Sequence, residues 1–256
     1  MLIYLYNKHY HNESPACVWG SYSGVVDNLK EQKFRHELKY YINHADYLTI
    51  RQRMSTIAGS DEHADENGTY KIRSLYFDTP GDKALYEKLY GINNREKFRI
   101  RLYNNDDSFV RLEKKTKVNA LTCKISAPVT RDQCEKLLVG DTDWMKNAGH
   151  ALLTELYAKM RYEQLRPKTL VDYTREPFTY GPGNVRVTLD SNITTGIRTT
   201  DLFDPAMPTI STYGVSVIIL EVKYDNYLPD IIRNMIQVEN RKATAFSKYA
   251  VARMFG

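Results

Sequence analysis

Cysteine is scarce in this 256-residue chain: Cys17, Cys123 and Cys134 are odd in number, and no two of them have CxxC spacing. Such a set argues against a disulfide framework or a structural zinc site and is typical of a reducing cytosol. Long apolar runs are also missing, since none approaches the roughly 20 residues of a membrane span. The first residues, MLIYLYNKHYHNE, are too polar for a secretory signal. The sequence therefore predicts a soluble, cytoplasmic protein without a transmembrane segment.

No Ser-His-Asp or Cys-His arrangement emerges from the sequence, and it contains no internal repeat and no low-complexity block. What the chain has instead is a mild excess of positive charge, with 36 Lys and Arg against 31 Asp and Glu, and an excess of tyrosine, with 20 Tyr against 8 Phe and 2 Trp. A net charge of +5 suits an anionic partner. Nucleic acid, phosphorylated metabolites and acidic membrane surfaces all remain open on this ground.

Residues 1–31 lack the periodicity of the rest of the chain. They mix tyrosine, histidine and small residues, as in SPACVWGSYSGVV, without a sustained period. His9 and His11 are spaced to share one face, but no third metal ligand accompanies them. We therefore expect a poorly structured N-terminal extension over 1–31 and a single domain over 32–256.

From residue 33 onward, strand-like and helical patterns follow one another. Strands are predicted at 33–42, 69–81, 95–103, 108–117, 121–128, 166–180, 183–193 and 215–224, and helices at 44–57, 82–91, 131–138 and 148–162, with two more after Pro229. Most of the strands follow one another as hairpins. The pattern predicts an α+β fold: a closed antiparallel eight-stranded β-barrel tunnel with a polar, basic interior and helices packed outside.

In the segment 95–103, REKFRIRLY, odd-numbered and even-numbered positions carry different kinds of side chain. Its odd positions carry four cations and a tyrosine, and its even positions carry Glu96 followed by Phe98, Ile100 and Leu102. Alternate side chains of a strand point to opposite faces. One face of this strand is therefore apolar and suited to pack under helices, while the other stacks like charges. We expect Arg99 and Arg101, near the middle, to contact an anion, and the earlier cations to lie toward a tunnel mouth.

Other strands repeat this separation. The polar faces carry Arg35, Glu37 and Lys39; Arg111, Glu113, Lys115 and Lys117; Lys124; Arg186 and Asp190; and Glu221 and Lys223. A solvated outer face explains any one strand, but ordinary outer faces mix Thr, Ser, Gln, Glu and Lys. A water-filled tunnel explains all of them together. Crowded cations inside it require a polyanion, which phosphate chains match best, and the few glutamates are suited to bind Mg²⁺ or Mn²⁺.

The motifs RHELKYYI, SLYFDTP, REKFRIRLY, LEKKTK, DYTREPF, VRVTLD, ILEVKY and SKY occur in this order over residues 33–254. In this order they resemble the VTC-type polyphosphate polymerase domain of the triphosphate tunnel metalloenzyme superfamily, a relative of CYTH domains. The resemblance implies a tunnel of eight antiparallel strands. It also implies transfer of the ATP γ-phosphate onto a growing inorganic polyphosphate chain, with Mn²⁺ or Mg²⁺ as cofactor.

Carried over by motif, the resemblance implies a catalytic set of Lys39, Arg99, Arg101, Lys115, Lys124, Arg175, Arg186 and Glu221, with Glu221 as the metal ligand. It implies further substrate-binding residues at Glu37, Glu113, Tyr173, Lys223, Ser247 and Lys248. We expect Glu37 and Glu113 to orient Lys39 and Lys115 or to hold a second cation. Ser247 is also a candidate N-cap for a helix over SKYAVARMF.

Two rival functions stay open. The same tunnel could hydrolyse tripolyphosphate or nucleoside triphosphates, or it could be a catalytically silent module that binds polyphosphate or inositol polyphosphate. Arg35 stands where the related hydrolase branch has the first Glu of an ExExK pattern, which favours the polymerase branch. The expected partners are ATP and inorganic polyphosphate or pyrophosphate, a membrane-protein partner is left open, and nucleic acid is not expected because tyrosines do not interleave with an exposed basic stripe.

Overall fold

The computed structural model describes residues 33–61, 64–196, 199–212, 217–239 and 241–254. The predicted extension over 1–31, with His9 and His11, lies outside the described residues, so the boundary at residue 32 stays a prediction. From Phe34 onward the chain forms one unit. None of the helices in the described part has both the length and the apolar composition needed to span a bilayer.

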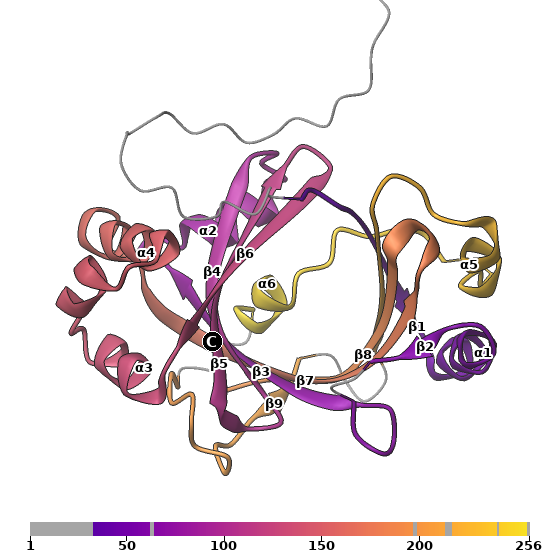
Figure 1. The fold of residues 1–256 in the computed structure, drawn as a ribbon, viewed down its shortest axis with the longest axis horizontal. Coiled ribbons are helices and arrows are strands. Elements are labelled where there is room, and N and C mark those ends of the chain that lie inside the picture. Colours follow the sequence, from indigo (N-terminus) through magenta and orange to yellow (C-terminus); the bar gives the residue numbers. More distant parts are fainter. Residues whose placement is uncertain (1–32, 62–63, 197–198, 213–216, 240, 255–256) are drawn as a thin grey trace, which may run out of the picture. The chain divides into compact units, whose positions relative to one another are not determined.

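One antiparallel sheet dominates this unit (Figure 1). Its eight long strands are hydrogen-bonded in the order β1 (His36–Ile42), β10 (Ile218–Tyr224), β8 (Val185–Thr195), β7 (Arg166–Tyr180), β3 (Tyr70–Asp78), β4 (Arg95–Tyr103), β5 (Asp106–Val118) and β6 (Leu121–Val129). Two short strands, β2 (Gly59–Ser60) and β9 (Ile210–Ser211), pair with β7 and β8. The predicted α+β class and eight-stranded antiparallel sheet are therefore confirmed.

The sheet curls into an open half-barrel, so the prediction of a closed barrel is wrong. Within the described residues its edge strands β1 and β6 meet at one isolated bridge, where Arg35 and Thr122 exchange backbone hydrogen bonds of 2.9 and 3.0 Å. Further along β1, residues 243–244 pair with the backbone of Lys39 and Tyr40. The C-terminal segment thus occupies the edge groups of β1 that a ladder with β6 would need.

The helices are α1 (His44–Ser55), α2 (Lys83–Leu89), α3 (Arg131–Leu138), α4 (Ala151–Tyr162), α5 (Asp230–Met235) and α6 (Lys248–Ala252), with 3₁₀ turns at Asp143–Asn147 and Pro182–Asn184. Local sequence sets where several of them begin. Capping boxes start α1 at Asn43 and α3 at Thr130, because each cap side chain and the side chain three residues later satisfy each other's backbone N–H groups. After α2 the chain turns at Gly91, whose φ of +69° favours glycine.

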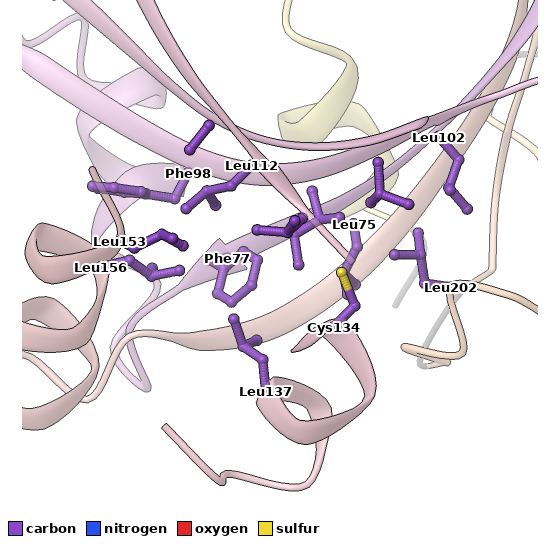
Figure 2. Close-up of a cluster of buried hydrophobic side chains, with 14 of the residues drawn as sticks. Leu75, Phe77, Phe98, Leu102, Leu112, Cys134, Leu137, Leu153, Leu156 and Leu202 are labelled. Carbon is purple, nitrogen blue, oxygen red and sulfur yellow. The ribbon is translucent and has the colours of Figure 1, made fainter. Parts of the chain in front are cut away.

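Apolar clusters on the convex side of the sheet hold these helices. Figure 2 shows the cluster in which Phe98 and Leu112 of the sheet meet Leu137 of α3 and Leu153 and Leu156 of α4. The predicted apolar face of the strand 95–103 is confirmed, since Phe98, Ile100 and Leu102 are each at most 2% exposed. A second cluster joins α1 and α5 to β1, β8 and β10. Both clusters leave the opposite, charged face of the strands free to line the concave side.

The concave side is not uniformly polar, which corrects the prediction that all helices pack outside. Figure 1 shows α6 inside the curl of the sheet. Its Tyr249 is fully buried and packs with Phe246 against Tyr70, Tyr76 and other apolar concave residues. The hydroxyl of Tyr249 donates to the Asp78 carboxylate, so the buried ring keeps a partner for its polar end. A single buried helix thus fills part of the predicted tunnel.

Candidate functional site

Strand register gathers the predicted site residues on the concave face. Lys39 of β1 stands opposite Glu221 of β10, and residues directly opposite in an antiparallel pair share a face. On the other side of the curl, Lys97 of β4 and Lys124 of β6 both stand opposite Lys115 of β5. The predicted residues on this face are Glu37, Lys39, Arg99, Arg101, Glu113, Lys115, Lys124, Tyr173, Arg175, Arg186, Glu221 and Lys223, and Ser247 and Lys248 come from the start of α6.

Glu113 organises three of the cations. Its carboxylate, 1% exposed, accepts from Nε of Arg99 at 2.7 Å and Nζ of Lys124 at 2.9 Å. A guanidinium nitrogen of Arg101 lies 3.5 Å away. Burial alone raises the pKa of Glu113, but these cations outweigh it and hold that pKa well below its usual range. The structure therefore pairs Glu113 with this group of cations rather than with Lys115, the expected partner.

Neutral oxygens orient the same two arginines. Arg99 donates to the hydroxyl of Tyr76 at 3.0 Å. Arg101 donates to the hydroxyl of Tyr173 at 3.1 Å and to Oγ of Ser74 at 3.3 Å. Because each guanidinium is planar and bonded from more than one side, its remaining N–H groups have fixed directions. Tyr173 thus serves the predicted site by positioning Arg101.

Asp190 organises a second group that sequence reasoning missed. Its fully buried carboxylate accepts from Nε and Nη2 of Arg175 at 2.7 and 2.8 Å and from Nζ of Lys248 at 2.5 Å. Burial favours the protonated acid, yet Arg175 and Lys248 lower the pKa of Asp190 to about 2. The parity of β8 placed this residue on the charged face, but nothing in the sequence identified its partners.

Glu37 and Glu221 form a third group, in which the two carboxylates share Lys39. Lys39 Nζ lies 3.0 Å from Glu37 and 4.0 Å from Glu221. Lys115 contacts the other oxygen of Glu37, and Lys223 lies 3.0 Å from Glu221. Burial opposes ionisation, but the lysines hold the pKa of Glu221 well below its usual range. Against the effect of burial, Lys39 and Lys115 likewise lower the pKa of Glu37, so ammonium groups compensate both carboxylates.

Arg186 lies outside these three groups. Its guanidinium contacts the carboxylate of Asp61 and donates to the hydroxyl of Tyr70 at 2.8 Å. Asp61 belongs to the polar connection before β3, where no sequence pattern indicated a functional residue. Arg186 is also more accessible than the buried arginines, with 34% of its side chain exposed.

The structure adds a pocket at one end of the face, which we call the mouth pocket. It is a cavity of about 100 Å³. The charged residues that line it are Glu37, Lys39, Lys88, Arg95, Glu96, Lys97, Lys115 and Lys117. The expected location of Arg95 and Lys97 at a mouth fits this pocket. Lys88 lies on α2, where helical spacing offered no sign that it would face strand residues.

The adjacent carboxylates are the part of this face that fits a divalent cation. Oε1 of Glu37 is buried and, among the described residues, makes no hydrogen bond, although it lies 3.0 Å from Lys39 Nζ. Within the same part of the chain, no three His, Cys, Asp or Glu side chains gather as a metal site. Glu37 and Glu221 would therefore supply two carboxylates, and a hard cation would take its remaining oxygens from substrate and water.

Several solved structures are similar to part of this chain. A candidate adenylate cyclase from Bacillus halodurans shares 13% identity with a TM-score of 0.45, over 75% of this chain and 81% of its own. The HpAC1 protein from Hippeastrum, for which a dominant triphosphatase activity is described, shares 11% identity with a TM-score of 0.48, over 87% and 95%. The PH1819 protein from Pyrococcus horikoshii shares 14% identity with a TM-score of 0.38, over 79% and 84%.

These identities and TM-scores transfer no function to this chain. No curated protein matches the sequence. The family comparison gives a direct result, because the sequence matches the VTC domain over residues 34–255, nearly the whole described part of the chain. The chain belongs to the VTC domain family.

Proposed function

We propose that this chain is a metal-dependent ATP–polyphosphate phosphotransferase. It transfers the γ-phosphate of ATP to the end of an inorganic polyphosphate chain on the concave face of the sheet. Membership of the VTC domain family supports this function. The cytoplasmic location and the use of Mn²⁺ or Mg²⁺ remain predictions that accompany it.

The observation that carries the proposal is the unequal charge of the concave face. Two buried carboxylates there are each shared by more than one cation: Glu113 contacts three, and Asp190 contacts two. Positive charge therefore remains in excess after every internal pair is made. Removing such charges from water is costly unless anions compensate them. A chain of phosphoryl groups supplies closely spaced negative charge and oxygen acceptors for arginine and lysine donors.

Phosphoryl transfer asks the protein chiefly for positioning and for cations near the developing charge. Arg99 and Arg101, held by Glu113 and two tyrosines, bind the triphosphate. Lys39 and Lys115 neutralise phosphoryl oxygens near the acceptor end. Glu221, with Glu37 beside it, would hold the divalent cation, which would supply positive charge to stabilise the phosphoryl oxygens. The terminal phosphate of the polyphosphate is the nucleophile, so no serine, cysteine or histidine is required.

The position of Arg35 supports transfer over hydrolysis. Its guanidinium lies 2.9 Å from the carboxylate of Asp225 and also contacts the backbone of Asn184. Arg35 thus stands at the position of the first glutamate of ExExK, and it is a cation paired with Asp225 at the edge of the sheet. Two adjacent carboxylates remain on the face, which suits one divalent cation better than two.

The direct test is incubation of the full chain with ATP and Mn²⁺, with gel analysis for long polyphosphate and a separate assay for free phosphate. We expect polyphosphate ladders and ADP, with little free phosphate. Release of free phosphate without polymer would instead assign the hydrolase function. Absence of both products, with polyphosphate still bound, would assign the silent binding function and overturn the proposal.

Substitution Glu221→Gln tests the metal site. It keeps the shape of the side chain and removes one ligand charge, so we expect turnover to fall by roughly 100-fold or more. Tripolyphosphate binding without metal should persist or strengthen, because a negative charge has left the face. The matched control is Asp230→Asn, which removes an exposed carboxylate on α5. Turnover by Glu221→Gln equal to that of the control would refute the assignment.

Substitution Glu113→Gln tests whether this face is built to receive anions. Losing the buried carboxylate leaves Arg99, Arg101 and Lys124 without compensation, and should lower the free energy of unfolding by about 3 kcal/mol. Added tripolyphosphate should restore part of that stability, so its stabilising effect should exceed that on the unsubstituted protein. Thermal unfolding with and without tripolyphosphate measures this. An equal or smaller effect on the variant would place the anion elsewhere.

A further inference from the structure

The mouth pocket contains positive charge that the carboxylates of the described residues do not compensate. Its two carboxylates are already engaged: Glu37 by Lys39 and Lys115, and Glu96 by Lys114 and Lys159. Among the described residues, the four remaining cations of the pocket form no ion pair. These four are Lys88, Arg95, Lys97 and Lys117. They differ in this from the arginines at Glu113 and Asp190, each of which has a carboxylate partner.

Of these four side chains, Lys97 is the one whose positive charge is least favourable when no ligand is bound. It stands opposite Lys115 across the β4–β5 ladder, and its Nζ donates to Oγ of Ser247 at 3.0 Å. The hydroxyl is a neutral partner and removes none of the repulsion. The charged side chains that line the mouth pocket with Lys97 are Glu37, Lys39, Lys88, Arg95, Glu96, Lys115 and Lys117. Lys97 also lines a second, smaller pocket with Asp78, Lys83, Glu87, Glu96, Lys159 and Glu163, and Arg99 of its own strand acts on its charge.

The pocket has the size and donors for a phosphoryl group. A cavity of about 100 Å³ greatly exceeds the roughly 10–15 Å³ that a single water requires. Ammonium and guanidinium donors converge on it from α2, β1, β4 and β5, and Ser247 and Thr244 add hydroxyls to its lining. A singly charged anion would leave most of these cations uncompensated, whereas linked phosphoryl groups carry repeated charge at short spacing.

We propose that the mouth pocket is a phosphate-binding subsite anchored by Lys97, and that it binds phosphoryl groups of a polyphosphate lying beyond those held by Arg99 and Arg101. This inference rests on the proposed function for the identity of the polyanion. The subsite shares Glu37, Lys39, Lys115 and Ser247 with the candidate site and contains none of the arginines paired with Glu113 or Asp190. It therefore gives the face a preference for chains longer than one triphosphate.

Binding at this subsite should change the protonation of Lys97. Burial and the neighbouring cations, Lys115 and Lys39 foremost, place the pKa of the Lys97 amine well below its ordinary value in the free protein. A phosphoryl group at hydrogen-bonding distance favours the ammonium form instead. Complex formation should therefore take up protons from solution under mildly alkaline conditions, and the difference in uptake between the unsubstituted chain and a Lys97 variant separates this contribution from protons that the terminal phosphates exchange.

Calorimetric titration with short-chain polyphosphate at about pH 8.5, in two buffers of different ionisation enthalpy, measures affinity and proton uptake together. Three variants are compared with the unsubstituted chain: Lys97→Met, Lys97→Arg and Lys136→Met, the last on the exposed surface of α3. Loss of the charged hydrogen bond should weaken binding by roughly 10- to 100-fold in Lys97→Met and reduce its proton uptake. Lys97→Arg should bind tightly with reduced uptake, and Lys136→Met should behave as unsubstituted.

Chemical labelling provides a readout independent of both folding yield and catalysis. Pyridoxal 5′-phosphate joins a neutral amine through its aldehyde with loss of water, and borohydride then reduces the imine to a stable secondary amine. We expect peptide mapping to find Lys97 labelled early, and short-chain polyphosphate to protect it. Equal labelling with and without polyphosphate, or unchanged affinity and proton uptake in Lys97→Met, would overturn the subsite.

These outcomes separate the inference from the proposed function. If the chain makes polyphosphate but Lys97 is neither protected nor needed for binding, the subsite is wrong and the function stands. If no polymer or free phosphate forms from ATP but Lys97 is protected and its loss weakens binding, the subsite stands on a protein that binds polyphosphate without turning over ATP.

Discussion

Crowding of like charge on one face of a curled sheet is the constraint on which the rest of the structure depends. Curvature brings the side chains of distant strands together on the concave side, so their repulsion grows as the sheet closes. Buried carboxylates limit this repulsion. Glu113 holds cations of β4 and β6, Asp190 joins β7 to α6, and Glu37 joins β1 to β5. The positive charge that remains on this face favours the binding of an anion.

The open form of the half-barrel follows from the same C-terminal segment that completes the site. Residues 243–244 occupy the edge of β1, and the chain then enters the curl as α6. This route brings Ser247 to Lys97 and Lys248 to Asp190. The apolar residues of α6, with Tyr249 at their centre, fill one part of the concave side, and the mouth pocket lies in the charged part. Apolar packing and clustered charge thus occupy different regions of one face.

The assignment of side chains to the two faces of the sheet could largely be predicted from the alternation of apolar and charged residues, because the two faces of each strand differ so sharply. Phe98, Ile100 and Leu102 were expected under helices and are buried there. The partners could not be predicted, since they depend on register between strands that are distant in sequence. Glu113 was expected beside Lys115 and instead holds the cations around it. A closed barrel was predicted wrongly, because no local sequence pattern indicates that residues 243–244 pair with the edge of β1.

The central claim is that the concave face binds a phosphate chain, and a crystal structure of the protein with tripolyphosphate and Mn²⁺ tests it most directly. The account predicts phosphate density contacting Arg99 and Arg101, with the metal at Glu221, and little movement of the carboxylate-bound cations. Phosphate density confined to the convex surface, with the concave cations still paired as they are here, would contradict it.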